Sequence, residues 1–101
     1  SQGYVFPVGE TPDNASWTGF QDVISKKAGG YLLVFREAHS ESSSGRIALK
    51  FLRDQPIILT DLLTGEKSRV MVDKDGFVSF SIAHPAGFKF YRYETTVQGG
   101  Q

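Results

Sequence analysis

Five large apolar residues follow two glycines in the segment GGYLLVFRE, residues 29–37. Because side chains alternate along a strand, Tyr31, Leu33 and Phe35 fall on one face and the residues between them on the other. A buried helix is the rival interpretation, but the run is short, rich in aromatic and branched residues and bounded by glycine, which favours a strand. A strand that is apolar on both faces needs cover on both sides. We therefore expect the central strand of a sheet, with Phe35 buried.

The rest of the chain consists of short apolar segments separated by turn residues, and none is a convincing helix. Eight Phe, four Tyr and eleven Gly also favour an all-β chain. Between two of the segments, residues 73–76 (DKDG) predict the tight turn of a β-hairpin. Short strands at near-regular spacing are typical of an antiparallel β-sandwich, here with about seven to eight strands. Strands are expected over residues 17–24, 31–38, 46–52, 57–63, 68–72, 77–82 and 88–94.

With 101 residues, the chain is long enough for one domain and too short for two. Residues 1–16 are rich in glycine, proline and polar side chains, so we interpret them as an extended lead-in or linker, although Tyr4 and its neighbours are apolar enough to pack on something. The sandwich is expected over residues 17–94, and residues 95–101 have the composition of a flexible tail. A polar loop at residues 39–45 has no apolar anchor, so we expect it to be the most mobile internal segment.

Composition excludes several classes of function. No cysteine occurs, which excludes disulfide frameworks, thiolate zinc sites and a cysteine nucleophile. Eleven basic residues balance eleven acidic ones, so we expect no binding to nucleic acid or to an anionic membrane surface. No apolar run approaches the roughly 20 residues of a membrane-spanning helix, and no signal segment is recognisable. The compartment stays open, with secretion or a periplasmic location both compatible with the sequence.

No catalytic or metal-binding constellation stands out, and we expect no cofactor. His39 and His84 stand in or beside turns, without the spacing of a metal site. The acidic turn at residues 73–76 matches part of a calcium loop, but it lacks the third oxygen ligand and the closing glutamate. Paired carboxylates for glycoside hydrolysis stay open, because acidic residues far apart in sequence approach one another in a fold. The acidic residues considered for such a pair are Asp61, Glu66 and Glu37.

The aromatic residues are the candidates for binding. Exposed tryptophan and tyrosine rings stack on the faces of sugars, and the same rings serve equally well as core or as a surface that docks another domain. Both interpretations stay open at this point. The candidate sugar-binding or docking aromatics are Tyr4, Trp17, Tyr91 and Tyr93.

Three segments resemble the C-terminal region of α-galactosidase-like (melibiase-type) glycoside hydrolases: VFPVGE at residues 5–10, SWTGFQ at 16–21 and GYLLVFRE at 30–37. The segment DLLTGE at residues 61–66 and the closing aromatic strand are similar to the same appended domain, which follows (β/α) barrels in this and related glycosidase families. The similarity spans residues 5–94. The catalytic aspartates of the family lie on barrel strands, and no segment here matches their motifs. The resemblance therefore implies no catalytic residue in this chain.

What the resemblance implies is a non-catalytic C-terminal β-sandwich that packs against and stabilises an upstream (β/α) barrel in the same chain. We expect such an accessory domain, monomeric in isolation and not itself an enzyme. The alternative is a carbohydrate-binding module that holds sugars through exposed Trp and Tyr rings, and a small independent enzyme is a third hypothesis. A coplanar set of exposed rings would favour the module, whereas a contiguous apolar patch on one face would favour docking.

Overall fold

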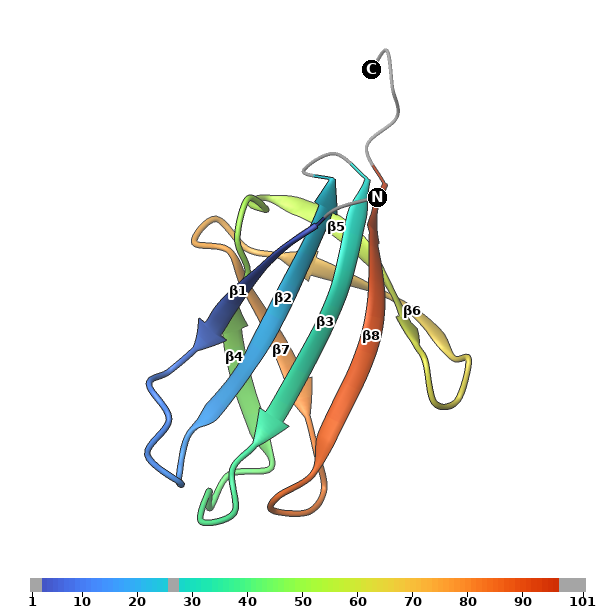
Figure 1. The fold of residues 1–101 in the computed structure, drawn as a ribbon. Helices are drawn as coiled ribbons and strands as arrows, with labels where there is room; N and C mark the ends of the chain where they lie inside the picture. Colours follow the sequence, from blue (N-terminus) through green and yellow to red (C-terminus); the bar gives the residue numbers. More distant parts are fainter. Residues whose placement is uncertain (1–2, 26–27, 97–101) are drawn as a thin grey trace.

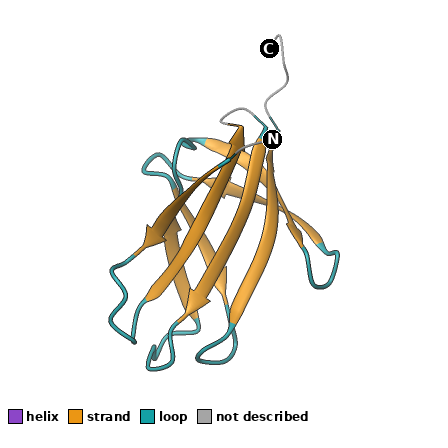
Figure 2. Cartoon of the chain, in the orientation of Figure 1, coloured by secondary structure: helices purple, strands orange, loops and turns teal. Residues whose placement is uncertain are grey.

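The computed structural model describes residues 3–25 and 28–96 and shows the predicted all-β sandwich, with eight strands in two antiparallel sheets (Figure 1). The described residues contain strands, loops and turns but no helix (Figure 2), and hence no helix that could span a membrane. The strands are β1 (Tyr4–Gly9), β2 (Trp17–Ser25), β3 (Gly29–Arg36), β4 (Ser44–Ala48), β5 (Gln55–Asp61), β6 (Lys67–Val72), β7 (Phe77–Ser81) and β8 (Phe88–Thr95).

Six strands form a large sheet in the order β1-β2-β3-β8-β5-β6, and β4 and β7 form a two-stranded sheet that faces it. β3 has a paired neighbour on each side, as its doubly apolar sequence predicts. The last strand, β8, lies between β3 and β5 and so joins β1-β2-β3 to β5-β6 (Figure 1).

The predicted hairpin across residues 73–76 is wrong. β6 pairs with β5 in the large sheet, whereas β7 pairs with β4 in the small one. The turn itself does form, because the Asp73 carboxylate accepts hydrogen bonds from the backbone N–H groups of Asp75 (2.8 Å) and Phe77 (2.9 Å). Such a turn satisfies its own donors and leaves open which sheet the next strand joins. Both strands bury apolar side chains in the same core, so the turn carries the chain from one layer to the other.

Part of the expected lead-in is a strand. Residues 4–9 form β1, which pairs with β2 along its whole length at the edge of the large sheet. Pro7 is tolerated there because an edge strand leaves half of its backbone donors unpaired. Val8 is buried in the core, so the segment belongs to the sandwich rather than to a linker. At the other end β8 reaches Thr95, and residues 97–101 of the expected tail lie outside the described part of the chain.

The strand expected over residues 46–52 is shorter than predicted. β4 ends at Ala48, and Phe51 has a φ of 66° in the loop that follows. This left-handed backbone, unusual for a large side chain, takes Phe51 out of the strand alternation. A strand continued to residue 52 would point Phe51 inward with Ile47, but the Phe51 side chain is 49% exposed. Its ring packs edge-on against Phe6 of β1, with the ring centroids 5.6 Å apart.

The core lies between the two sheets and contains buried side chains from each of the eight strands. The buried core residue of β6 is Val72. Burial of such a side chain contributes about 1.5–3 kcal/mol each. β3 buries its even-numbered face, with Leu32 and Val34 both at 0% exposure. The prediction that Phe35 is buried is therefore wrong, because Phe35 points to the outer face and is partly exposed. β3 thus presents apolar residues on a face that the sandwich does not cover.

A buried amide links the two layers. Gln21 of β2 is 0% exposed and makes three hydrogen bonds. Its Oε1 accepts from the backbone N–H of Lys50 (2.7 Å), and its Nε2 donates to the Lys50 carbonyl (3.1 Å) and to the Tyr93 hydroxyl (3.0 Å). The loop after β4 is thereby fixed to β2 and β8.

The loop at residues 39–45 has no apolar anchor but is held by polar contacts. The expectation that it is the most mobile internal segment stays a prediction. Buried Arg36 donates from Nη2 to the Ser40 carbonyl at 2.9 Å, and Trp17 donates from Nε1 to the Ser42 carbonyl at 3.2 Å. Arg36 also donates from Nη1 to the carbonyls of Ile82 and Ala83, which directly follow β7, at 3.1 Å each. One guanidinium therefore joins this loop to the start of the β7–β8 loop.

Candidate functional site

Two of the four aromatic candidates are core residues. Trp17 is 5% exposed and Tyr93 is 2% exposed. Gly45 lies against the indole of Trp17, so closely that any Cβ at this position would collide with the ring. A ring that is covered in this way can neither stack on a sugar nor contact another domain. Trp17 and Tyr93 are therefore not candidates for binding a sugar or another domain.

Tyr4 and Tyr91 have accessible surface but do not share a site. Tyr4 is 75% exposed on the edge strand β1, three strands away from β8. Tyr91 is half-buried on the inner face of β8, with its ring centroid 5.8 Å from that of Phe80. Burial raises the pKa of the Tyr91 hydroxyl, and the negative charges of Asp61 and Glu66 raise it further. The four candidates do not form the coplanar set that a sugar-binding strip needs.

The outer face of the large sheet carries a different aromatic set. The strand register places three rows of outward side chains across β2, β3 and β8. The rows are Phe20–Leu33–Phe90, Thr18–Phe35–Phe88 and Asp22–Tyr31–Arg92. We name their six apolar members the outer aromatic patch: Phe20, Tyr31, Leu33, Phe35, Phe88 and Phe90.

The outer aromatic patch is accessible and continuous. Phe20 is 50% exposed, Phe88 47% and Phe90 37%, and the other three members are partly exposed. Two pairs of rings pack across neighbouring strands, Tyr31 with Phe90 at 6.2 Å and Phe35 with Phe88 at 5.9 Å between centroids. The solvent face of an antiparallel sheet is normally polar, and a contiguous apolar patch marks an interaction surface. This face is our first candidate site.

The patch continues on both sides. On β1, Pro7 lies opposite Phe20, and a groove of about 370 Å³ beside them is lined by Pro12 and Gly19 as well. Beyond β8, the backbone N–H of Leu62 donates to the carbonyl of Phe90 at 2.9 Å. The Leu62 side chain is 41% exposed. The apolar surface therefore extends from the β1 edge to the loop after β5.

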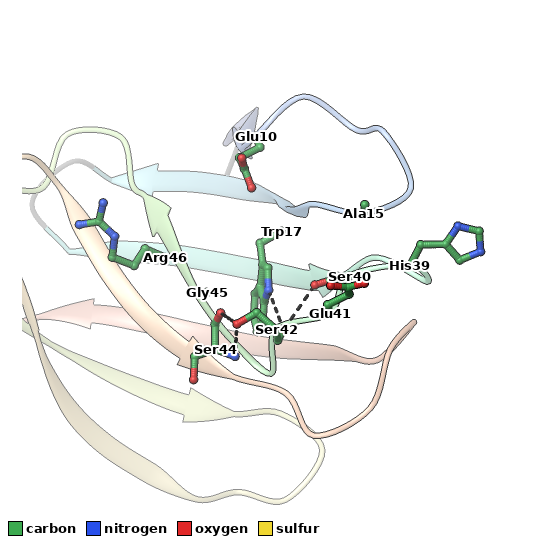
Figure 3. Close-up of a pocket in the computed structure, with 10 residues that line it drawn as sticks. All are labelled: Glu10, Ala15, Trp17, His39, Ser40, Glu41, Ser42, Ser44, Gly45 and Arg46. Carbon is green, nitrogen blue, oxygen red and sulfur yellow. Dashed lines mark hydrogen bonds between the residues drawn. The ribbon is translucent and has the colours of Figure 1, made fainter.

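An open hollow of about 550 Å³ at one end of the sandwich is the second candidate site (Figure 3). Its walls carry the carboxylates of Glu10 and Glu41 and several serine hydroxyls. The His39 ring points away from the hollow in Figure 3, and the guanidinium of Arg46 stacks over Phe77, 4.2 Å from the ring centroid. The hollow thus offers polar groups but no bare ring face, and its walls come mainly from two loops.

Two of the three carboxylates considered for glycoside hydrolysis accept hydrogen bonds from backbone N–H groups in turns or loops. The Asp61 carboxylate accepts hydrogen bonds from the backbone N–H groups of Leu63 (2.8 Å) and Thr64 (3.1 Å). The bond from Leu63, above all, holds the pKa of Asp61 below its usual value, against the opposing effect of burial. Glu37 accepts backbone hydrogen bonds from the β1–β2 loop at 3.0 and 3.2 Å, and Glu66 is exposed. Two of the three are thus engaged with backbone in different loops.

The remaining polar candidates are surface residues. His39 and His84 are exposed in different loops, and His39 contacts the side-chain amide of Asn14 at 3.2 Å between the nitrogens. The pKa of Asp73 is lowered, chiefly by the hydrogen bond from the Phe77 N–H. Within residues 3–25 and 28–96, no group of three or more His, Asp or Glu side chains is arranged to hold a metal ion.

Comparison with protein-family models, with curated proteins and with solved structures found no match. The outer aromatic patch and the resemblance in the sequence are therefore the two observations that bear on function. Of the patch residues, the sequence indicated that Tyr31, Leu33 and Phe35 share a face, but nothing local showed that this face points away from the second sheet.

Proposed function

We propose that this chain is the non-catalytic β-sandwich of an α-galactosidase-like glycoside hydrolase, and that it packs against and stabilises a (β/α) barrel. The observation that supports the docking role is the outer aromatic patch, which the sandwich leaves uncovered. A (β/α) barrel is surrounded by helices, and helices pack their apolar stripes on sheet faces. The resemblance to the family supplies the identity of the proposed partner.

The gain from covering the patch is large enough to matter. A phenylalanine side chain has roughly 200 Å² to bury. With Phe20, Phe88 and Phe90 each about half exposed, roughly 250–300 Å² of aromatic surface is available. At about 25 cal/mol per Å² this corresponds to at most about 7 kcal/mol, comparable with the 5–15 kcal/mol stability of a typical domain. Covering the patch would therefore contribute substantially to the stability of both partners.

The decisive experiment begins with the coding sequence immediately upstream, where the proposal expects a (β/α) barrel. In that longer protein, Phe88→Ser is compared with Phe51→Ser. The two rings are comparable, because Phe88 is 47% and Phe51 49% exposed and each packs against an aromatic ring of a neighbouring segment. Phe88→Ser is expected to lower the temperature at which the barrel loses activity, and Phe51→Ser is not. A different upstream domain, or equal effects of the two variants, contradicts the proposal.

The second candidate function is a carbohydrate-binding module, which the gathering of exposed aromatic rings on one sheet face favours. Against it, five of the six patch residues are Phe or Leu, which offer no hydrogen bond to a sugar hydroxyl, and only Tyr31 does. NMR titration with galactose, raffinose and several polysaccharides separates the two. We expect no binding tighter than about millimolar and no hydrolysis of an α-galactoside. Saturable shifts at the patch in sub-millimolar sugar would replace docking by sugar binding.

A further inference from the structure

Two of the three rows across the outer face place matching or oppositely charged side chains on β2 and β8, on either side of β3. In the row through Leu33, a phenylalanine stands on each side, Phe20 on β2 and Phe90 on β8. In the row through Tyr31, an acidic residue stands on β2 and a basic residue, Arg92, on β8. The acidic residue is Asp22, and its place across β3 from Arg92 makes the charges of this surface complementary to themselves.

Consider a two-fold axis that runs along β3 in the plane between two copies packed face to face. Rotation about this axis lays the β2 side of one copy over the β8 side of the other. Asp22 of each copy then faces Arg92 of the other, and Phe20 of each faces Phe90 of the other. Leu33 meets its own copy at the axis. Face-to-face sheets pack with their strands within about 30° of each other, which an axis along β3 permits.

We propose that the outer aromatic patch binds a second copy of this chain in a two-fold symmetric dimer, with Asp22 of each copy paired with Arg92 of the other. An interface of this type is isologous, so one surface must complement itself in shape and in charge, and the patch does so in charge. The proposal goes beyond the docking role. A barrel and a second copy exclude one another on this face, so the dimer is the state of the sandwich with no barrel attached.

The size of the face sets the strength of the dimer. The outer face from β1 to β5 has five neighbouring strands about 4.8 Å apart, and its three rows are about 7 Å apart. These spacings give roughly 500 Å² per copy. The total buried area of roughly 1,000 Å² lies at the low end of specific interfaces. We therefore expect a weak dimer, populated above roughly 100 μM, and a monomer at low micromolar concentration. Under this proposal, the expected monomer is the state of the dilute protein only.

Arg92 already has an acidic neighbour in its own chain. Its Nη1 lies 3.3 Å from Glu94 Oε1, and both side chains are more than 40% exposed. An ion pair with this exposure is weak, and a guanidinium has five N–H donors. The pair to Glu94 therefore orients Arg92 on the outer face and leaves donors for a carboxylate of the other copy.

The test is sedimentation equilibrium of the chain at concentrations from about 10 μM to about 1 mM, where a weak dimer dissociates. Asp22→Arg and Arg92→Asp each place like charges opposite one another twice in the dimer. Each is expected to weaken dimerisation at least about tenfold. The double variant D22R/R92D restores opposite charges in both pairs, and it is expected to recover dimerisation to within about threefold of the natural chain. Leu33→Lys places two like charges at the axis and is expected to leave only monomer.

Two controls keep the result interpretable. Ser81→Lys adds the same charge as Leu33→Lys on the exposed face of β7, on the other sheet, and is expected to leave the dimer unchanged. Circular dichroism checks that every variant is folded. A natural chain that is monomeric at about 1 mM overturns the proposal. So does a double variant no better than the single ones, because only a contact between two copies allows the two reversals to compensate. Either result would overturn the dimer but not the proposed docking on a barrel, because that docking does not require this surface to complement a second copy of itself.

Discussion

The buried amide of Gln21 allows a quantitative test of how the two layers are held together. Gln21→Leu keeps a similar side-chain volume but removes three hydrogen bonds, two to the backbone of Lys50 and one to the Tyr93 hydroxyl. At a net value of about 1 kcal/mol each, their loss lowers the free energy of unfolding by about 3 kcal/mol. The N–H and carbonyl of Lys50 are left without this partner, which sets the figure above that of a surface substitution.

The comparison variant is Tyr93→Phe, which removes only the hydroxyl. Gln21 still holds both backbone groups of Lys50 there, so we expect a loss of about 1 kcal/mol. Urea unfolding followed by circular dichroism measures both, with an unchanged m-value indicating the same denatured state. In the double variant the shared hydrogen bond is counted once, so its loss is smaller than the sum of the two. A loss below about 1 kcal/mol for Gln21→Leu would refute the idea that this amide links the layers.

Three further predictions follow from the faces and turns of the sandwich. Leu32→Ala, on the inner face of β3, is expected to lower the free energy of unfolding by about 2–5 kcal/mol in a urea melt. Leu33→Ala, on the outer face, is expected to lower it by less than about 1.5 kcal/mol. Equal losses would contradict the assignment of faces. Gly45→Ala forces a methyl group into the indole of Trp17, so we expect lower stability and altered tryptophan fluorescence, and an unchanged emission spectrum would count against the contact. The folded pKa of Asp73 is lowered, so its contribution to stability is present above the unfolded pKa near 3.8 and is lost as the pH falls through the lowered value. The drop in urea midpoint from about pH 6 to about pH 3 should accordingly be smaller in Asp73→Asn than in the natural chain, and an equal drop would show that the turn does not depend on this charge.

The sequence predicts the fold class and most strand positions because both depend on alternation and turn residues, which are local. It does not show which face of a doubly apolar strand the second sheet covers. For β3 the choice between Leu32 and Phe35 is made by β4 and β7, which come later in the chain. The same limit applies at residues 73–76, where one turn sequence serves equally for a hairpin and for a crossing between layers.

The candidate site was less predictable than the fold. Trp17 and Tyr93 are the residue types that bind sugars, but their burial results from contacts with Gly45 and Gln21, which are distant in sequence. The outer aromatic patch depends on the register between β2, β3 and β8. Strands β3 and β8 are separated by about half of the chain, and no local pattern specifies how they align. A surface assembled across three strands is therefore visible only in the folded chain.

The position of β8 also determines when this protein can fold. Before residues 88–95 have been synthesised, β3 and β5 have no common neighbour, and each exposes an unpaired edge rich in apolar side chains. Such edges recruit strands from other nascent chains. Because β8 follows β3 and β5 in the chain, the large sheet closes only after residues 88–95 have emerged from the ribosome, by pairing its two distant halves. Closure of this kind is slow, so the yield of soluble protein should depend on how long the two open edges are shielded during synthesis.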